Sequence, residues 1–242
     1  MQWVDGAVSA EDSVLAAEPV SGRLLRDTFL AEMPAITLGL VRARNESLWL
    51  GPIELIRFGR PKITDAAVEW PIEGGLMVGS PGGRWRIGDS GGRLVASLHG
   101  YRPLLPRPIY AWTQLPIHHL TTRLYLLRVR GRKDGPGVPA RTSERRQAAL
   151  VDVAVCATIA RLFGGQRRVQ IFLGIAVGYH VACWSTSGQT LGGLVTRQRV
   201  VSVDGSRLTP TQSLARLAAL PLSWILRRPV HDEFAGTGVV AD

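Results

Sequence analysis

The chain has 242 residues, a mean hydropathy of +0.09 and a formal charge of +10 at pH 7. This length allows two modest domains, and a mean hydropathy so close to zero confines any membrane-spanning character to part of the chain. The positive charge rests on 27 arginines against two lysines. It fits anionic lipid head groups, whereas the absence of a recognisable DNA- or RNA-binding motif excludes nucleic acid from the expected partners.

The first 35 residues are predicted to be a partly disordered N-terminal segment, because residues 1–20 are acidic and rich in alanine. The start, M-Q-W-V-D-G-A-V, lacks the basic residues and the apolar stretch of a secretory signal peptide. We therefore expect the first half of the chain to stay in the cytoplasm.

Residues 36–130 are predicted to fold as an α+β domain. Short β-favouring segments alternate with glycine and proline, which is typical of strands joined by turns. The strands of this antiparallel sheet are expected at 48–50, 53–58, 67–78, 84–87 and 93–98. A long helix over 106–130 is predicted to follow, with a kink at Pro116, because proline removes a helical hydrogen bond.

A sheet followed by a long helix is a distant likeness of START-like lipid-binding domains. The helix carries aromatic and arginine side chains that suit contact with an anionic lipid leaflet, and packing on its own sheet is the alternative. These residues are Tyr110, Trp112, Arg123, Tyr125, Arg128 and Arg130. An apolar cavity within 36–130 would favour a lipid- or hydrophobe-binding module, whereas a filled core would favour a scaffold or transport role.

The second half is predicted to be a helical membrane domain. Residues 131–144 combine glycine, proline and charge without an apolar period, as in a linker. Within 145–242, a spanning helix needs about 20 mostly apolar residues. We expect 148–163 and 169–187 to span, and the short run 217–226 to form a third, interfacial or re-entrant helix. A three-span arrangement is the alternative.

Basic residues near the ends of these segments predict the orientation. Residues 123–146 contain eight Lys or Arg, the loop after the second helix contains three Arg, and the turn 164–168 contains two. Because basic residues stay on the cytoplasmic side, the N-terminal domain and the loop after the second helix are predicted to be cytoplasmic. The expected location is the plasma membrane, with more than one pass.

Four motifs follow one another over roughly the last hundred residues. They are R-R-Q-A-A-L-V-D from Arg145, G-Q-T-L-G from Gly188, V-D-G-S-R-L-T from Val203 and H-D-E-F-A-G-T from His231. Their order resembles the RDD family of bacterial membrane proteins over about 145–240. The resemblance implies an integral membrane protein for which transport is the usual suggestion.

The resemblance also implies which residues fill the family's named positions. Arg145 or Arg146 stands for the arginine, Asp152 for the first aspartate and Asp232 for the second. Family members usually have a lysine after G-Q-T-L-G, and Gly193 takes that place here. Any role that needs an amine at this position is therefore in doubt.

Asp152 is the residue most open to a functional reading. A carboxylate within an apolar helix costs about 2.5–3.5 kcal/mol on insertion scales, so it should face the helix bundle and find a partner. Arg145 lies seven residues earlier and ~20° round the helix, on the same face. Two readings stay open: an Asp152–Arg145 structural clamp, which we favour narrowly, and an ion or ligand site.

The pair His231–Asp232 allows two readings as well. Such a pair can move protons, or it can cap the following element at the head groups. Asp204-Gly205 is predicted to be the turn of a local hairpin between V-V-S-V and S-R-L-T.

No catalytic constellation is visible in the sequence. G-D-S-G-G at 88–92 imitates the surroundings of a protease serine, but no histidine precedes His99. No spacing defines a metal site, so neither enzyme activity nor a cofactor or metal is predicted. The residues considered and set aside are Glu73, His99, His118, His119, Cys156 and Cys183.

The leading hypothesis is an RDD-type protein that serves in transport or as an accessory subunit of a membrane complex. The alternative is a membrane-anchored module that binds a lipid or hydrophobe through its N-terminal α+β domain. Expected partners are anionic lipids, with other subunits of a membrane complex or further copies of the chain as additional candidates.

Overall fold

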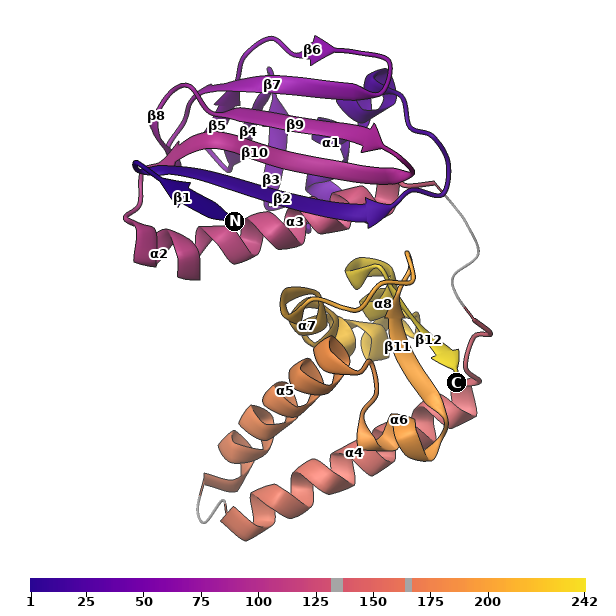
Figure 1. Ribbon diagram of the computed structural model, residues 1–242. Coiled ribbons are helices and arrows are strands. Elements are labelled where there is room, and N and C mark those ends of the chain that lie inside the picture. Colours follow the sequence, from indigo (N-terminus) through magenta and orange to yellow (C-terminus); the bar gives the residue numbers. More distant parts are fainter. Residues whose placement is uncertain (132–136, 164–166) are drawn as a thin grey trace. The chain divides into compact units, whose positions relative to one another are not determined.

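The computed structural model describes residues 1–131, 137–163 and 167–242, in two compact units, Met1–Lys133 and Asp134–Asp242 (Figure 1). The division falls within the range 131–144 that the sequence marked as a linker. Residues 132–136 of that range, and 164–166 of the turn between the two apolar segments, lie outside the described residues.

The first unit is an antiparallel sheet with helices, as predicted. Neighbouring strands follow the order β1-β2-β10-β9-β7-β5-β4-β3, with β6 beside β7 and β8 beside β10. The strands are β1 Gln2–Val4, β2 Ala7–Leu15, β3 Val41–Arg44, β4 Ser47–Leu50, β5 Ile53–Phe58, β6 Lys62–Ile63, β7 Ala67–Gly74, β8 Val78–Ser80, β9 Arg84–Ser90 and β10 Arg93–Pro103. All of the predicted strand regions contain strands.

The prediction of a partly disordered segment over 1–35 is wrong. These residues contain β1, β2 and most of helix α1, Gly22–Ile36. Val8, Ala10 and Val14 are buried at every second position of β2, apart from half-buried Asp12, and the strand pairs with β10. This alternation is the mark of a half-buried strand, and the acidic, alanine-rich composition concealed it.

Aromatic side chains fill the interior between the sheet and its helices. Phe29 of α1 contacts Trp70 and Trp85 of the sheet, with ring centres 5.1 and 5.8 Å apart. Tyr125 lies in α3, Gln114–Val129, and its ring centre is 5.3 Å from that of Phe29. The two helices therefore share one core on one face of the sheet (Figure 1).

The predicted helix over 106–130 is two helices, α2 Arg107–Trp112 and α3. They separate at Thr113, one turn before the expected kink at Pro116. The missing N–H of Pro116 and its ring remove the bond to the carbonyl of Trp112, so the helix breaks before the proline.

The second unit is built on a helical hairpin. Helix α4, Thr142–Phe163, and helix α5, Arg168–Thr186, form its two arms. The other elements gather at the end opposite the turn between the arms (Figure 1). They are α6 Leu191–Val195, β11 Gln198–Ser202, α7 Pro210–Leu226, α8 Val230–Ala235 and β12 Thr237–Ala241.

The predicted local hairpin at Asp204-Gly205 is wrong. Strand β11 pairs antiparallel with β12, from Gln198 opposite Ala241 to Ser202 opposite Thr237. The turn itself is present, because Asp204 accepts hydrogen bonds from the amide and hydroxyl of Ser206. The chain then enters α7 instead of returning as a strand.

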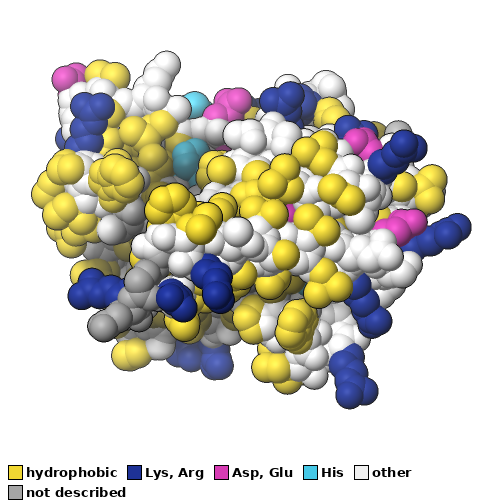
Figure 2. All heavy atoms as spheres, turned by 90° about the horizontal axis from the view of Figure 1, so that it is seen from below, with side chains coloured by type: hydrophobic (Ala, Val, Ile, Leu, Met, Phe, Trp, Pro, Cys, Tyr) yellow, Lys and Arg dark blue, Asp and Glu magenta, His cyan; other side chains and the backbone are white. Residues whose placement is uncertain are grey.

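Helix α4 buries a narrow stripe and exposes the rest of its apolar surface. Its buried residues recur at every fourth position: Ala148, Asp152, Cys156 and Ala160. Small residues on such a stripe allow close helix packing, as in membrane helix pairs. Large apolar side chains remain exposed on both arms, among them Leu150, Leu162, Phe163, Val169 and Leu173. Figure 2 shows hydrophobic side chains lying open over much of one face of the molecule.

Within the described residues, one helix is long and apolar enough to cross a membrane, Arg168–Thr186. Trp184 is its buried residue, and its other side chains are half-buried or exposed. Helix α4 has sufficient length but carries Asp152, Arg161 and a charged first turn. Of the two helices predicted to span a membrane, α5 alone therefore has the required length and composition among the described residues.

Candidate functional site

Asp232 lies at the centre of a buried charged group that we call the arginine–aspartate cluster: Arg145, Arg216, His231, Asp232 and Thr237. Arg145 of α4 donates to Asp232 Oδ2 at 2.5 Å, and Arg216 of α7 donates to Oδ1. Thr237 of β12 donates to the same oxygen at 2.9 Å. One carboxylate thereby joins side chains from α4, α7 and β12, of which Arg145 on α4 lies 87 residues from Asp232.

Arg216 is the most deeply buried cation of this cluster, with 4% of its side chain exposed. Its guanidinium carbon lies 5.1 Å from the ring centre of Trp184 on α5, a cation–π contact. Burial and the nearby Arg145 lower the pKa of Arg216 to about 9. Two arginines share one carboxylate, so the cluster keeps an excess of positive charge at neutral pH.

His231 stays neutral within the cluster. Its Nδ1 lies 2.7 Å from Ser223 Oγ, and its Nε2 lies 3.4 Å from Arg145 Nη2. Burial, Arg216 and Arg145 lower the pKa of His231 to about 4. A histidine that is neutral throughout the physiological range is a poor proton carrier there, which weighs against the proton-moving reading of the His231–Asp232 pair. The capping reading fails too, because Asp232 lies inside α8 and Pro229 is its N-cap.

The expected Asp152–Arg145 clamp is wrong. Arg145 contacts Asp232 and His231 instead. Seven residues of helix separate Arg145 from Asp152 by ~10 Å along the axis, so a carboxylate supplied by α8 beside the first turn is the nearer partner. Arg146 is exposed, which leaves Arg145 as the arginine that faces the interior.

Asp152 has a different set of partners, which we call the Asp152 site: Asp152, Tyr179, His180 and the backbone N–H of Gly192. The Tyr179 hydroxyl on α5 donates to Asp152 Oδ1 at 2.7 Å, and the Gly192 N–H donates to it at 2.8 Å. The other oxygen, Oδ2, lies 3.9 Å from His180 Nε2. The carboxylate is 7% exposed.

The state of His180 follows from its second nitrogen. His180 Nδ1 lies 2.8 Å from the carbonyl oxygen of Ala176, and a carbonyl can only accept. Nδ1 therefore carries a proton, and in neutral His180 Nε2 is an acceptor that lies 3.9 Å from Asp152 Oδ2. Two neighbouring acceptors of this kind can both interact with a proton or a cation placed between them.

The G-Q-T-L-G motif holds the backbone of this site in place. Thr190 caps α6 by accepting from the Gly193 N–H at 3.1 Å. A Cβ on Gly192 would lie 2.1 Å from the carbonyl oxygen of Ala148, so only glycine allows α6 to approach α4 this closely. A Cβ on Gly193 would lie 2.8 Å from the carbonyl oxygen of Gln198. The lysine that is usual in the family would therefore require the backbone to shift locally at this position.

A chain of contacts links the two carboxylate sites. The ring centres of His180 and Trp184, one turn apart on α5, are separated by 4.9 Å. Trp184 in turn contacts the Arg216 guanidinium, which holds Asp232. Arg216, Tyr179 and Trp184 are site residues that no sequence motif predicted. The available signal for Arg216 is its charge directly before the apolar run 217–226.

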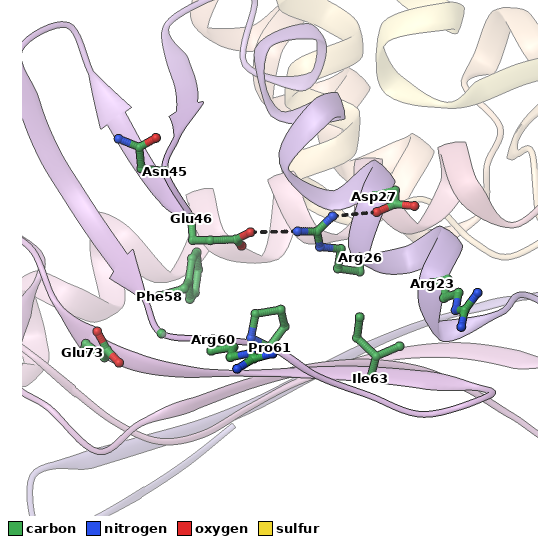
Figure 3. Close-up of a pocket in the computed structure, with 11 residues that line it drawn as sticks. Arg23, Arg26, Asp27, Asn45, Glu46, Phe58, Arg60, Pro61, Ile63 and Glu73 are labelled. Carbon is green, nitrogen blue, oxygen red and sulfur yellow. Dashed lines mark hydrogen bonds and ion pairs between the residues drawn. The ribbon is translucent and has the colours of Figure 1, made fainter.

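The first unit has pockets on its surface. A pocket of about 730 Å³ lies beside α1 and is lined mostly by charged side chains. Arg26 bridges Glu46 and Asp27 there, at 3.2 and 2.9 Å, with Phe58 and Pro61 nearby (Figure 3). Neither the closely packed aromatic rings of the interior nor this charged pocket supports a hydrophobe-binding module.

His118 and His119, two of the residues set aside as site candidates, have partners within the first unit. His118 packs its ring 5.3 Å from that of Trp85, and burial lowers its pKa to about 4. His119 pairs with Asp12 at 2.7 Å. Among residues 1–131, 137–163 and 167–242, no three His, Cys, Asp or Glu side chains converge to hold a metal ion.

A helical hairpin with one arm apolar enough to cross a membrane and with buried charges at its open end is consistent with membrane association. Residues 168–238 match the RDD family, so the C-terminal unit contains an RDD family domain, as the motifs predicted. The match includes Arg216 and Asp232 but begins after Arg145 and Asp152, whose assignment to family positions stays a prediction. Comparisons with curated proteins and with solved structures give no match, and the START-like likeness is not supported.

Proposed function

We propose that the second unit is an integral membrane domain in which both α4 and α5 span the bilayer. The support is the set of apolar side chains exposed on both arms and the burial of Asp152, the carboxylate within the apolar part of α4, on the stripe that faces its partners. Helix α7, with its apolar last turn, forms the third, interfacial or re-entrant element. The first unit then lies in the cytoplasm, because the basic residues over 123–146 favour that side.

Two experiments test this arrangement. Extraction of membranes with alkaline carbonate should leave the protein in the pellet, and release into the supernatant would contradict integration. In a variant with Cys156 and Cys183 replaced by alanine, a cysteine at Ser143 should react with an impermeant maleimide only in opened cells. A cysteine at Arg167 should react in intact cells, and the reverse order would invert the topology.

The function that this geometry supports best is transport of a proton or a small monovalent cation through the Asp152 site. One observation carries the proposal: Asp152 Oδ2 and Nε2 of neutral His180, which are both acceptors, lie 3.9 Å apart, with no arginine in contact with the carboxylate among its described partners. A buried carboxylate inside a membrane bundle is a usual site for ion or proton exchange. Tyr179 and the Gly192 N–H orient the carboxylate while leaving Oδ2 available.

Flux measurements in proteoliposomes test this proposal. Purified protein is reconstituted with an internal pH indicator, and a pH gradient or a sodium or potassium gradient is imposed. The wild type should dissipate the gradient, Asp152→Asn should abolish the flux, and His180→Gln should reduce it strongly. Asp27→Asn, which removes an exposed carboxylate of the first unit, is the matched control.

The other predicted role, as an accessory subunit of a membrane complex, gives a different outcome. The purified protein would show no flux, and affinity purification in mild detergent would recover other membrane proteins at fixed stoichiometry. Flux by the purified chain alone would argue against the accessory role. The hydrophobe-binding alternative has less support, because the interior of the first unit is filled.

A further inference from the structure

The end of α7 presents apolar side chains and cations side by side on the surface. Trp224, Ile225 and Leu226 are 82%, 76% and 51% exposed, although they form one continuous turn of helix. Arg227 and Arg228 follow directly and are exposed as well. Tryptophan beside arginine at the end of an apolar run is the composition of a segment at the membrane–water interface.

Arg227 ends the helix in an unfavourable backbone conformation. Its φ is +52°, the left-handed region that helix ends usually assign to glycine or asparagine. This conformation is costly for a residue with a Cβ. An arginine at this position keeps a cation at the helix end in spite of that cost.

The arginine–aspartate cluster lies behind this tip and has its own surplus of charge. The backbone N–H of His231, three residues beyond Arg228, donates to Ser223 of α7 at 2.9 Å, so α8 folds back against the helix. Arg145 and Arg216 share Asp232, while Arg228 is 3.5 Å from Glu233. This end of the unit thus has four cations, Arg145, Arg216, Arg227 and Arg228, against two carboxylates, Asp232 and Glu233. Arg216 Nε is buried without a hydrogen-bond partner among the described residues.

We propose that this end of the second unit, with Trp224, Ile225, Leu226, Arg227 and Arg228 as its surface, binds the head group of an anionic phospholipid. The phosphate lies against the two terminal arginines, and the apolar turn enters the acyl region of the same leaflet. This inference rests on the proposed membrane placement of α4 and α5, but not on transport. Charge complementarity selects an anionic lipid over a zwitterionic one, at about 1 kcal/mol for each arginine near the surface.

The position within the unit supports the same assignment. Trp184, at the C-terminal end of α5, packs with Leu208, Leu217 and Leu220, so α7 lies against the end of the spanning helix. Arg145, in the first turn of α4, reaches α8 at the same end of the hairpin (Figure 1). A spanning hairpin therefore places the α7–α8 region at the level of the head groups.

Native mass spectrometry of the full-length protein in detergent tests the proposal. Phosphatidylglycerol and phosphatidylcholine are titrated separately, and their dissociation constants are compared. The wild type should prefer phosphatidylglycerol by about tenfold or more, and the double variant Arg227→Gln/Arg228→Gln should lose that preference. The control Arg84→Gln/Arg86→Gln removes two exposed arginines from the first unit and should retain it.

Further variants keep the result interpretable. Arg227→Lys/Arg228→Lys should restore the preference, which shows that charge is the cause even if the glutamine variant folds poorly. Trp224→Ala should weaken the binding of both lipids to a similar extent. Asp152→Asn should keep the lipid preference, so a failure of the transport proposal remains distinguishable.

Three outcomes would overturn the inference. They are an equal affinity of the wild type for both lipids, the same loss in the Arg84/Arg86 control, and competition by inorganic phosphate at concentrations similar to those of the lipid. The last outcome would identify a free-anion site in place of a lipid site.

Discussion

The two buried carboxylates of the second unit have opposite surroundings. Asp232 is held by Arg145 and Arg216, whose charges outnumber its own. Asp152 is held by a phenol and a backbone N–H, with a histidine at 3.9 Å. Two arginines make Asp232 a structural link, whereas no arginine is among the described partners of Asp152. Under the proposed function, the same residue type serves two roles within one domain.

The largest expected effect concerns Asp232. Replacing it by asparagine leaves two arginines beside each other in a buried site without a carboxylate. We expect a loss of about 3–5 kcal/mol in the free energy of unfolding, measured by denaturant titration in detergent with tryptophan fluorescence as the signal. Glu233→Gln, at the exposed neighbouring position, should change it by no more than about 0.5 kcal/mol. Equal stability of the two variants would contradict a structural role for Asp232.

The second prediction concerns acid. The folded pKa of His231, about 4, lies below the unfolded value of 6.5, so the unfolded chain binds the proton first as the pH falls. The contribution of neutral His231 to the free energy of unfolding is therefore complete above pH 6.5. It is lost as the pH falls towards 4, by up to about 3 kcal/mol. Amide hydrogen exchange in α7 and α8 should become faster as this stability is lost, and His231→Gln should make the exchange less dependent on pH. Exposed His99→Gln is the control, and an unchanged profile in His231→Gln would contradict the account.

The third prediction concerns the close approach that presents the Gly192 N–H to Asp152. Gly192→Ala places a Cβ 2.1 Å from a backbone oxygen of α4, so α6 must move away. The expected cost is about 1–3 kcal/mol in the free energy of unfolding, together with weakened flux. Gly174→Ala on α5 meets nothing within 4 Å and should be neutral or slightly stabilising. Similar losses in both variants would indicate a general intolerance of α5 and α6 to side chains.

The smallest expected change in stability belongs to Asp152. Asparagine retains an oxygen that accepts from Tyr179 and Gly192, and it removes the charge. Asp152→Asn should therefore shift the free energy of unfolding by less than about 1 kcal/mol while abolishing flux. A variant that is stable and fully active would reduce Asp152 to a packing residue.

Local patterns predicted much of this molecule. Residues 53–58 form a strand with those bounds, and the motif order identified the RDD family domain. Alternation in β2 was also present in the sequence, but its alanines and acids masked it. The partner of Arg145 could not be predicted, since Asp232 lies 87 residues further along the chain and reaches it through the packing of α7 and α8. Periodicity places Arg145 and Asp152 on one helix face, but tertiary contacts decide which carboxylate it meets.

A double-mutant cycle on Arg145 tests the central claim most directly, because it asks which carboxylate the arginine neutralises. Arg145→Gln is combined in turn with Asp232→Asn and with Asp152→Asn, and the free energy of unfolding is measured for each single and double variant. We predict a coupling of about 2 kcal/mol with Asp232 and less than about 0.5 kcal/mol with Asp152. A larger coupling with Asp152 would contradict the separation into a structural and an exchangeable carboxylate.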